Sequence, residues 1–206
     1  MNQPANKRVL LISNSTLHGH GYLDHVEGKI RDFLGPARSV VFAPYAVHDR
    51  QGYAARARER FRAMGCTLES LHDVSNPRRA IEEADAIFVG GGNTFRLLKA
   101  LYDCDVLGAI RGAVESGTPY IGSSAGSIVA CPSLKTTKDM PIVQPPSFGA
   151  LGLVEFQISP HYLVPMRNRC TWGRRRRSAS CSSWKRMKVQ LWACARAGCC
   201  ASKVTR

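Results

Sequence analysis

The chain has 206 residues, of which 44% are hydrophobic and 21% are charged, as expected for one globular domain with a hydrophobic core. No apolar run reaches the roughly 18 residues of a membrane-spanning helix, and no cleavable leader pattern opens the sequence, so we expect a cytoplasmic protein without a membrane partner. The net charge of +14 suggests a nucleic-acid or membrane-surface partner only if that charge is spread over the whole chain.

Apolar strand patterns alternate with helical patterns up to about residue 161. The predicted strands cover residues 8–13, 39–43, 66–71, 86–89 and 119–121, and a further strand-like run covers residues 154–158. The predicted helices cover residues 23–34, 53–64, a segment that opens at 76–77, and residues 94–101, 106–116 and 127–130. This alternation predicts an α/β fold with a mainly parallel sheet flanked by helices on both faces.

Residues 122–126 read Gly-Ser-Ser-Ala-Gly and fit the G-x-S-x-G pattern between a predicted strand and a predicted helix. A serine on such a turn projects its hydroxyl above the sheet, and the flanking glycines relieve crowding. The N–H of Ala125 then points to where an oxyanion would develop. Ser124 is the predicted nucleophile, while a tight turn with a buried hydroxyl is the alternative that this motif alone leaves open.

A second glycine-rich turn, residues 90–94 with the sequence Gly-Gly-Gly-Asn-Thr, also follows a strand and opens a helix. Its free amides can form a nest that supplies a second oxyanion donor or holds a carboxylate. No Gly-Lys-Ser/Thr follows and the G-x-G-x-x-G spacing is absent, which argues against a phosphate or dinucleotide site. The structural alternative is a tight turn with Asn93 as the helix N-cap, and this is compatible with a functional role.

A serine hydroxyl is a weak nucleophile until a base takes its proton, so a histidine and an orienting acid are required. Of the six histidines, His161 follows the strand-like run, where a loop at the sheet edge would bring it to Ser124. Asp139 is the acid that lies between them in the chain. Because the order Ser, Asp, His is one of several in which this triad recurs, the order permits the assignment without proving it.

The C-terminal segment, residues 166–206, differs abruptly in composition from the domain predicted over residues 1–165. From residue 167 onwards it holds 12 of the 29 basic residues, none of the 15 acidic ones, five of the eight Cys and all three Trp, so the first 166 residues carry a net charge of only +2. This composition predicts either a disordered basic tail or a segment translated out of frame. The cysteines lack metal-site spacing, so no metal is expected.

Six short motifs occur in a fixed order along the chain. They are Ser-Asn-Ser-Thr-Leu at 13–17, Val-Gly-Gly-Gly-Asn-Thr-Phe at 89–95, Tyr-Ile-Gly-Ser-Ser-Ala-Gly at 120–126, Cys-Pro at 131–132, Thr-Thr-Lys-Asp-Met-Pro-Ile-Val at 136–143 and Pro-His-Tyr at 160–162. Together they resemble the alpha-aspartyl dipeptidase (peptidase E) family over about residues 7–163.

The resemblance implies a fold similar to class I glutamine amidotransferase-like domains and a serine dipeptidase that hydrolyses Asp-Xaa dipeptides through an acyl-enzyme, without metal or organic cofactor. The implied nucleophile, orienting acid and base are Ser124, Asp139 and His161. The implied oxyanion hole is formed by amides near Gly92 and Ala125, and Asn93 lies in the implied substrate pocket.

Beyond residue 163 the resemblance fails, because residues 173–176 read Gly-Arg-Arg-Arg where the family has a Gly-Glu-Thr-Arg-like helix followed by further strands. C-terminal elements of the domain are therefore expected to be missing, and the family's arginine for the substrate aspartate matches no residue here. Three alternatives stay open: a cyanophycinase-like peptidase, an inactive truncated remnant, and a nucleic-acid-binding protein that acts through the basic tail.

Overall fold

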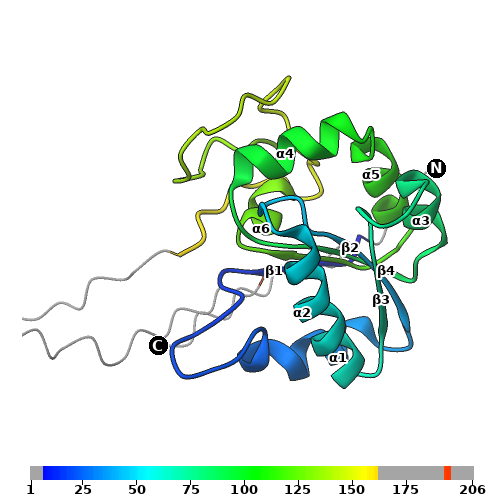
Figure 1. Cartoon of the computed structure of the whole chain (residues 1–206). Helices are drawn as coiled ribbons and strands as arrows, with labels where there is room; N and C mark the ends of the chain where they lie inside the picture. Colours follow the sequence, from blue (N-terminus) through cyan, green and yellow to red (C-terminus); the bar gives the residue numbers. More distant parts are fainter. Residues whose placement is uncertain (1–6, 162–192, 196–206) are drawn as a thin grey trace, which may run out of the picture.

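The computed structural model describes residues 7–161 and 193–195 of the chain, whose strands form one sheet in the order β3-β2-β4-β5-β1-β6 (Figure 1). The strands are β1 Val9–Ile12, β2 Ser39–Ala43, β3 Thr67–Ser70, β4 Ala86–Val89, β5 Tyr120–Ser123 and β6 Ala193–Ala195. Strands β1 to β5 pair in parallel, and β6 pairs antiparallel with β1. The predicted α/β class with a mainly parallel sheet is confirmed.

Helices cover both faces of this sheet, with α1 and α2 on one side and α4, α5 and α6 on the other (Figure 1). The helical segments are the 3-10 turn Asp24–Val26, α1 Glu27–Leu34, α2 Arg50–Ala63, α3 Pro77–Glu83, α4 Thr94–Asp103, α5 Leu107–Glu115 and α6 Ala125–Val129. Parallel strands covered in this way are buried on both faces and read as continuous apolar runs. All four residues of β1 and all four of β4 are buried.

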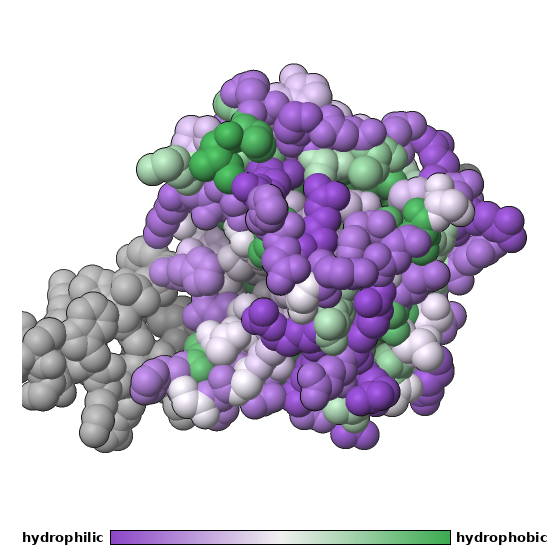
Figure 2. All heavy atoms as spheres, viewed as in Figure 1, coloured by the Kyte–Doolittle hydropathy of each residue, from purple (hydrophilic) through white to green (hydrophobic). Residues whose placement is uncertain are grey.

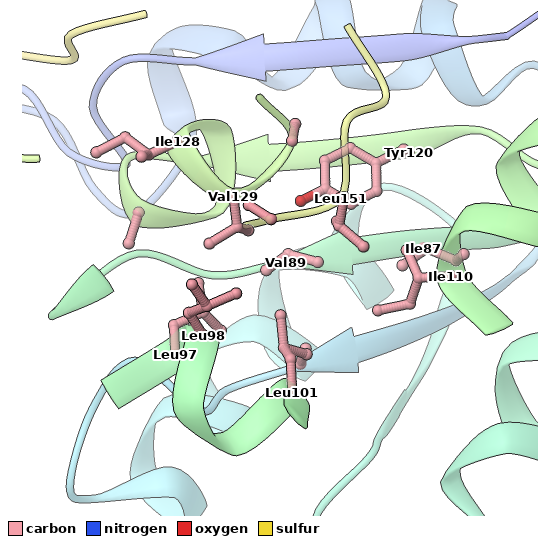
Figure 3. Packing of buried hydrophobic residues seen from close by; sticks show 14 of the residues in the cluster. Ile87, Val89, Leu97, Leu98, Leu101, Ile110, Tyr120, Ile128, Val129 and Leu151 are labelled. Atoms are coloured by element: carbon pink, nitrogen blue, oxygen red, sulfur yellow. The ribbon is translucent and has the colours of Figure 1, made fainter. Parts of the chain in front are cut away.

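Alternate residues of each strand enter two separate hydrophobic clusters, because successive side chains of a strand point to opposite faces. Val40 and Phe42 of β2 pack with α1 and α2, whereas Val41 packs on the other face with α4, α5 and α6. Figure 3 shows this second cluster, in which Leu98 of α4 and Val129 of α6 meet the sheet. The two clusters fix the strands, and therefore fix where each strand ends.

Side-chain caps define the starts of α2, α3 and α4. Asn76 caps α3 by accepting a hydrogen bond from the backbone of Arg79 at 3.1 Å. Asp49 caps α2 by accepting one from Gly52 at 2.8 Å, so α2 begins three residues before the predicted start at residue 53. The Ala-rich and Arg-rich stretch that suggested the later start does not include the first turn, which the capping aspartate stabilises.

The strand predicted at residues 154–158 is wrong: this run is irregular in the structure. The chain before it turns back onto the end of α6, where the N–H of Leu151 donates to the Val129 carbonyl at 2.8 Å and the N–H of Leu153 donates to the Ala130 carbonyl at 2.8 Å. These leucines are buried in the second cluster. Their backbone donors are thus satisfied by a helix end rather than by a neighbouring strand.

The expectations for residues 166–206 lie outside the described residues, except at 193–195. There β6 pairs with β1, Val9 opposite Ala195 and Leu11 opposite Ala193, within a segment whose composition predicted no regular element. Among the residues that the structure describes, no helix is long and apolar enough to cross a membrane.

Gly126 of α6 lies against the backbone of the central strand β4, where a Cβ would stand 2.1 Å from the Val89 carbonyl oxygen. We expect Gly126→Ala to lower the free energy of unfolding by about 1–3 kcal/mol, because a backbone carbonyl cannot yield as a side chain would. Urea titration of the full chain measures this change.

Gly112→Ala on α5 is the matched control, because nothing lies within 4 Å of a Cβ at that position. It should raise the free energy of unfolding by about 0.5–1 kcal/mol, since alanine loses less backbone entropy in a helix. An unfolding midpoint of the Gly126 variant equal to that of the unmodified chain would contradict the close approach of α6 to β4.

Candidate active site

The predicted site residues gather at the carboxyl ends of β4, β5 and β1, which are neighbours in the sheet. The glycine loop, residues 90–93, follows β4, Ser124 follows β5, and Ser13 follows β1. In open α/β sheets, ligands bind in the crevice outside these strand ends. The strand order therefore places the two motifs side by side although they are about 30 residues apart in the sequence.

Ser124 occupies a strained turn between β5 and α6, with φ 51° and ψ −107°. A non-glycine residue at positive φ costs energy and persists only where the surrounding structure holds it. Here the Ser124 N–H donates to the Ile12 carbonyl at 2.9 Å, and the Ser127 hydroxyl lies 2.7 Å from the Gly122 carbonyl oxygen. The strand-to-helix context predicted for the G-x-S-x-G motif is confirmed.

The Ser124 hydroxyl forms a hydrogen bond of 2.7 Å with Nε2 of His161. His161 is itself held by its backbone, because its N–H donates to the Ser13 hydroxyl at 2.9 Å. A neutral imidazole whose Nε2 carries no proton accepts the serine proton in this geometry. The structure thus brings together the predicted nucleophile and the predicted base.

Burial and two charged groups act on the pKa of His161. Burial lowers the pKa of the imidazole from its ordinary value, because a desolvated imidazolium is disfavoured. The charge of Asp139 raises this pKa, and the charge of Lys138 lowers it. Partial burial has the largest effect, so His161, although the residue keeps an exposed surface, stays neutral and able to accept a proton to a lower pH than a histidine surrounded by water.

The glycine loop faces Ser124 at close range. A Cβ on Gly91 would lie 3.0 Å from the Ser124 Cβ, and one on Gly92 would lie 2.6 Å from the Ala46 carbonyl oxygen. The Gly91 N–H is occupied, since it donates to the Tyr53 hydroxyl at 2.9 Å.

The two amides predicted to form the oxyanion hole are those of Gly92 and Ala125. Within residues 7–161, neither N–H donates to another group of the chain. An amide that serves an oxyanion must be free of an internal acceptor, and both amides meet this requirement. Their role as oxyanion donors stays a prediction.

Asp139, from the loop after α6, contacts the first residue of α4. Its Oδ2 accepts hydrogen bonds from the Thr94 N–H at 2.7 Å and from the Thr94 hydroxyl at 2.5 Å. Within the described part of the chain it forms no hydrogen bond with His161, on which it acts through its charge. Its predicted role as the orienting acid therefore rests on proximity and stays a prediction.

Asn93 is the N-cap of α4, as the sequence predicted, and its Oδ1 accepts from the Arg96 N–H at 3.0 Å. Its Nδ2 donates to the Met140 carbonyl at 2.8 Å. An amide nitrogen carries two N–H groups, so one donor is left for a ligand beside this structural bond. The substrate-binding role of Asn93 stays a prediction.

Sequence reasoning missed three residues that support the site: Ser13, Tyr53 and Thr94. Ser13 and Thr94 both belong to short polar motifs that end a strand or open a helix, so the neighbouring residues indicate that these two lie near the site. Tyr53 lies in α2, and nothing in its local sequence indicates that its hydroxyl reaches the glycine loop.

The loop after α6, residues 132–150, borders this site at the upper left of Figure 1, and Figure 2 shows a hydrophobic patch over the same region. Its exposed large apolar side chains are Met140, Ile142 and Phe148. The loop is tied to the glycine loop through Asn93 and Met140. The site is thus bordered by an apolar surface that would suit an uncharged, apolar part of a ligand.

Metal-ligating side chains do not cluster in the part of the chain that the structure describes: no group of three or more His, Cys, Asp or Glu residues there could hold a metal ion. Within residues 7–161 the cysteines are Cys66, Cys104 and Cys131, and all three are free thiols.

Known proteins resemble this chain in sequence. A peptidase E of Streptomyces coelicolor is 51% identical over 157 residues, which are 76% of this chain and 65% of that protein. A Drosophila melanogaster protein named "Probable alpha-aspartyl dipeptidase" is 49% identical over 162 residues, which are 77% of this chain and 68% of that protein. The chain thus spans about two thirds of the length of these relatives.

Solved structures resemble it in fold. The crystal structure of a protein described as a peptidase E from Listeria monocytogenes EGD-e superposes with a TM-score of 0.65 at 26% identity, over 77% of this chain and 80% of that one. A peptidase from an acI-B1 Actinobacterium gives a TM-score of 0.59 at 16% identity, over 77% and 70% of the two chains, and shows the fold alone. The predicted class I glutamine amidotransferase-like fold is confirmed.

The model of peptidase family S51 matches residues 9–186, and so extends past residue 163, where the recognisable motifs end. This match covers most of the chain, and it includes the turn at Ser124 between β5 and α6, the glycine loop and His161. The chain belongs to peptidase family S51.

Proposed function

We propose that this chain is a serine dipeptidase that hydrolyses dipeptides with an N-terminal aspartate. The observation that carries the proposal is the 2.7 Å hydrogen bond between the Ser124 hydroxyl and Nε2 of His161, with the glycine loop facing the same serine. Membership of family S51 and the names of the curated relatives support the reaction class. The cytoplasmic location expected from the sequence stays a prediction.

Ser124 attacks the peptide carbonyl carbon while His161 takes the hydroxyl proton at Nε2. The tetrahedral intermediate collapses, the C–N bond breaks, and His161 returns the proton to the leaving amine. Water then attacks the aspartyl ester on Ser124 while His161 takes a proton from it; the ester C–O bond breaks, His161 returns the proton to the Ser124 oxygen, and free aspartate is released. Every proton in this sequence passes between Ser124, His161, the substrate and water.

The negative oxygen of each tetrahedral intermediate is stabilised by the N–H groups of Gly92 and Ala125, which come from opposite sides of Ser124. One belongs to the loop after β4 and the other to the first residue of α6. Removal of one such donor in other serine hydrolases costs roughly 10²–10³ in kcat. The dipole of α6 adds little, because the helix has only five residues.

Two further residues have proposed roles in this reaction. Asp139 favours the imidazolium that forms on His161 during the reaction, because its charge raises the pKa of that side chain. Asn93 is the last residue of the glycine loop and keeps one amide N–H for the substrate, since its other amide N–H donates to the Met140 carbonyl.

Hydrolysis of Asp-Leu by the full chain tests the proposal, with Leu-Leu and an isoaspartyl dipeptide assayed beside it. We expect activity on Asp-Leu alone. Ser124→Ala should lower kcat/KM by at least about 10³-fold, because loss of the nucleophile leaves only binding and oxyanion stabilisation.

Ser123→Ala is the matched control, because Ser123 adjoins Ser124 and its buried hydroxyl has no hydrogen-bond partner among the described residues. This variant should keep the activity of the unmodified chain. Hydrolysis of the isoaspartyl dipeptide in place of Asp-Leu would favour the cyanophycinase-like alternative. A folded chain that cleaves none of the three substrates would be the inactive remnant.

The pH profile of kcat/KM tests the environment of His161. Burial lowers the pKa of this base, so the acid limb of the profile should fall below the ordinary value of about 6.5. Lys138→Met removes a charge that lowers the pKa, so the limb should move to higher pH. Lys135→Met, an exposed lysine three residues away, is the matched control and should leave the limb in place. A downward shift in the Lys138 variant would show that another group controls the limb.

A further inference from the structure

The sequence of the glycine loop does not by itself fix the conformation of its backbone. Three consecutive glycines have more backbone freedom than any other tripeptide, yet an oxyanion donor must be held in place before the reaction begins. The Gly92 amide can serve Ser124 only if contacts from other parts of the fold remove this freedom.

Two contacts hold the loop from the side of α2 and β2. The Tyr53 hydroxyl accepts from the Gly91 N–H at 2.9 Å, and the Ala46 carbonyl accepts from the Asn93 N–H at 2.9 Å. The Gly92 amide lies between these two points and has no acceptor within residues 7–161. The loop is thus fixed on both sides of the one N–H that is left for a ligand.

A third contact holds the loop where it enters α4. It is a closed ring of hydrogen bonds formed by Thr94, Thr137 and Asp139, which we call the loop anchor. The Asp139 N–H donates to the Thr137 hydroxyl at 3.2 Å, and that hydroxyl donates to the Thr94 hydroxyl at 3.1 Å. The Thr94 hydroxyl then donates to Oδ2 of Asp139 at 2.5 Å. Each hydroxyl gives one proton and accepts one, so the direction of the ring is fixed.

The loop anchor is partly buried, since Thr137 and Asp139 are half-buried. Thr94 is fully buried, and the Asp139 carboxylate also accepts from its N–H at 2.7 Å. That N–H is one of the donors that a helix start leaves without a partner, and a negative charge at a helix N-terminus is favourable. The segment around residue 139 therefore holds α4 at the residue where the glycine loop ends.

We propose that Thr94 and Asp139 are positioning residues that fix the glycine loop so that the Gly92 N–H keeps its place beside Ser124. This inference rests on the proposed function for its catalytic consequence, but the restraint on the loop can be measured without any substrate. Thr94 carries no charge, so a substitution there leaves in place the charges of Asp139 and Lys138 that act on the pKa of His161.

Thr94→Val tests the inference, because valine keeps the shape and the backbone N–H but removes the hydroxyl from the ring. We expect amide hydrogen exchange in residues 91–94 to become at least about tenfold faster, as expected for a loop that opens locally. We also expect kcat on Asp-Leu to fall roughly 10- to 100-fold with little change in KM, because misplacement of a catalytic group can cost about 10²-fold. The acid limb of the pH profile should not move.

Thr94→Ser should restore both exchange and kcat, because it restores the hydroxyl. Thr137→Val opens the same ring outside α4 and should give a change of the same kind if Thr94→Val proves too unstable to purify. Asp103→Asn at the other end of α4, where an exposed acid pairs with Lys99, is the matched control and should change neither quantity.

Unchanged exchange in both valine variants would overturn the inference. So would faster exchange with an unaltered kcat, because the loop would then not depend on the anchor for its catalytic role. A chain that cleaves no dipeptide but still shows faster exchange in the valine variants would overturn the proposed function and support the restraint on the loop.

Discussion

The close approach of α6 to β4 is the constraint on which the site depends. A Cβ on Gly126 would collide with the Val89 carbonyl, and one on Gly122 would lie 2.6 Å from the Gly126 carbonyl oxygen. Only a chain without side chains at these positions can turn so sharply after β5. This sharp turn places Ser124 at positive φ and directs its hydroxyl toward His161. The strain at Ser124 is therefore supported by the packing of the central strands.

The electrostatics of the site follow from the same packing. His161 is held by two residues that follow neighbouring strands, the Ser124 hydroxyl after β5 and the Ser13 hydroxyl after β1. Burial favours the neutral form, while Asp139 and Lys138 act in opposite directions on the pKa. Desolvation thus has the main effect on the pKa of His161, and the two adjacent loop residues, Lys138 and Asp139, shift it further in opposite directions.

The sequence predicted those parts of the fold that depend on local pattern. Alternation of strands and helices, the cap at Asn93 and the turn at Ser124 could be read directly, because each depends on residues within a few positions. The strand prediction for residues 154–158 was wrong, because their apolar side chains fit a strand although this segment follows a loop that folds back onto α6. The contact of Tyr53 with Gly91 could not be foreseen, because it depends on how α2 lies on the sheet.

The contact between His161 and Ser13 joins residues 148 positions apart, whereas His161 and Ser124 are 37 apart. Closing the longer of these two loops costs more chain entropy, because the entropy of loop closure grows with the number of residues enclosed. The position of His161 therefore depends on an element at the start of the chain, since β1 pairs with β5 and Ser13, which follows β1, holds the backbone of His161. A substitution in β1 thus reaches the contact between His161 and Ser124 although it lies far from both residues in the sequence.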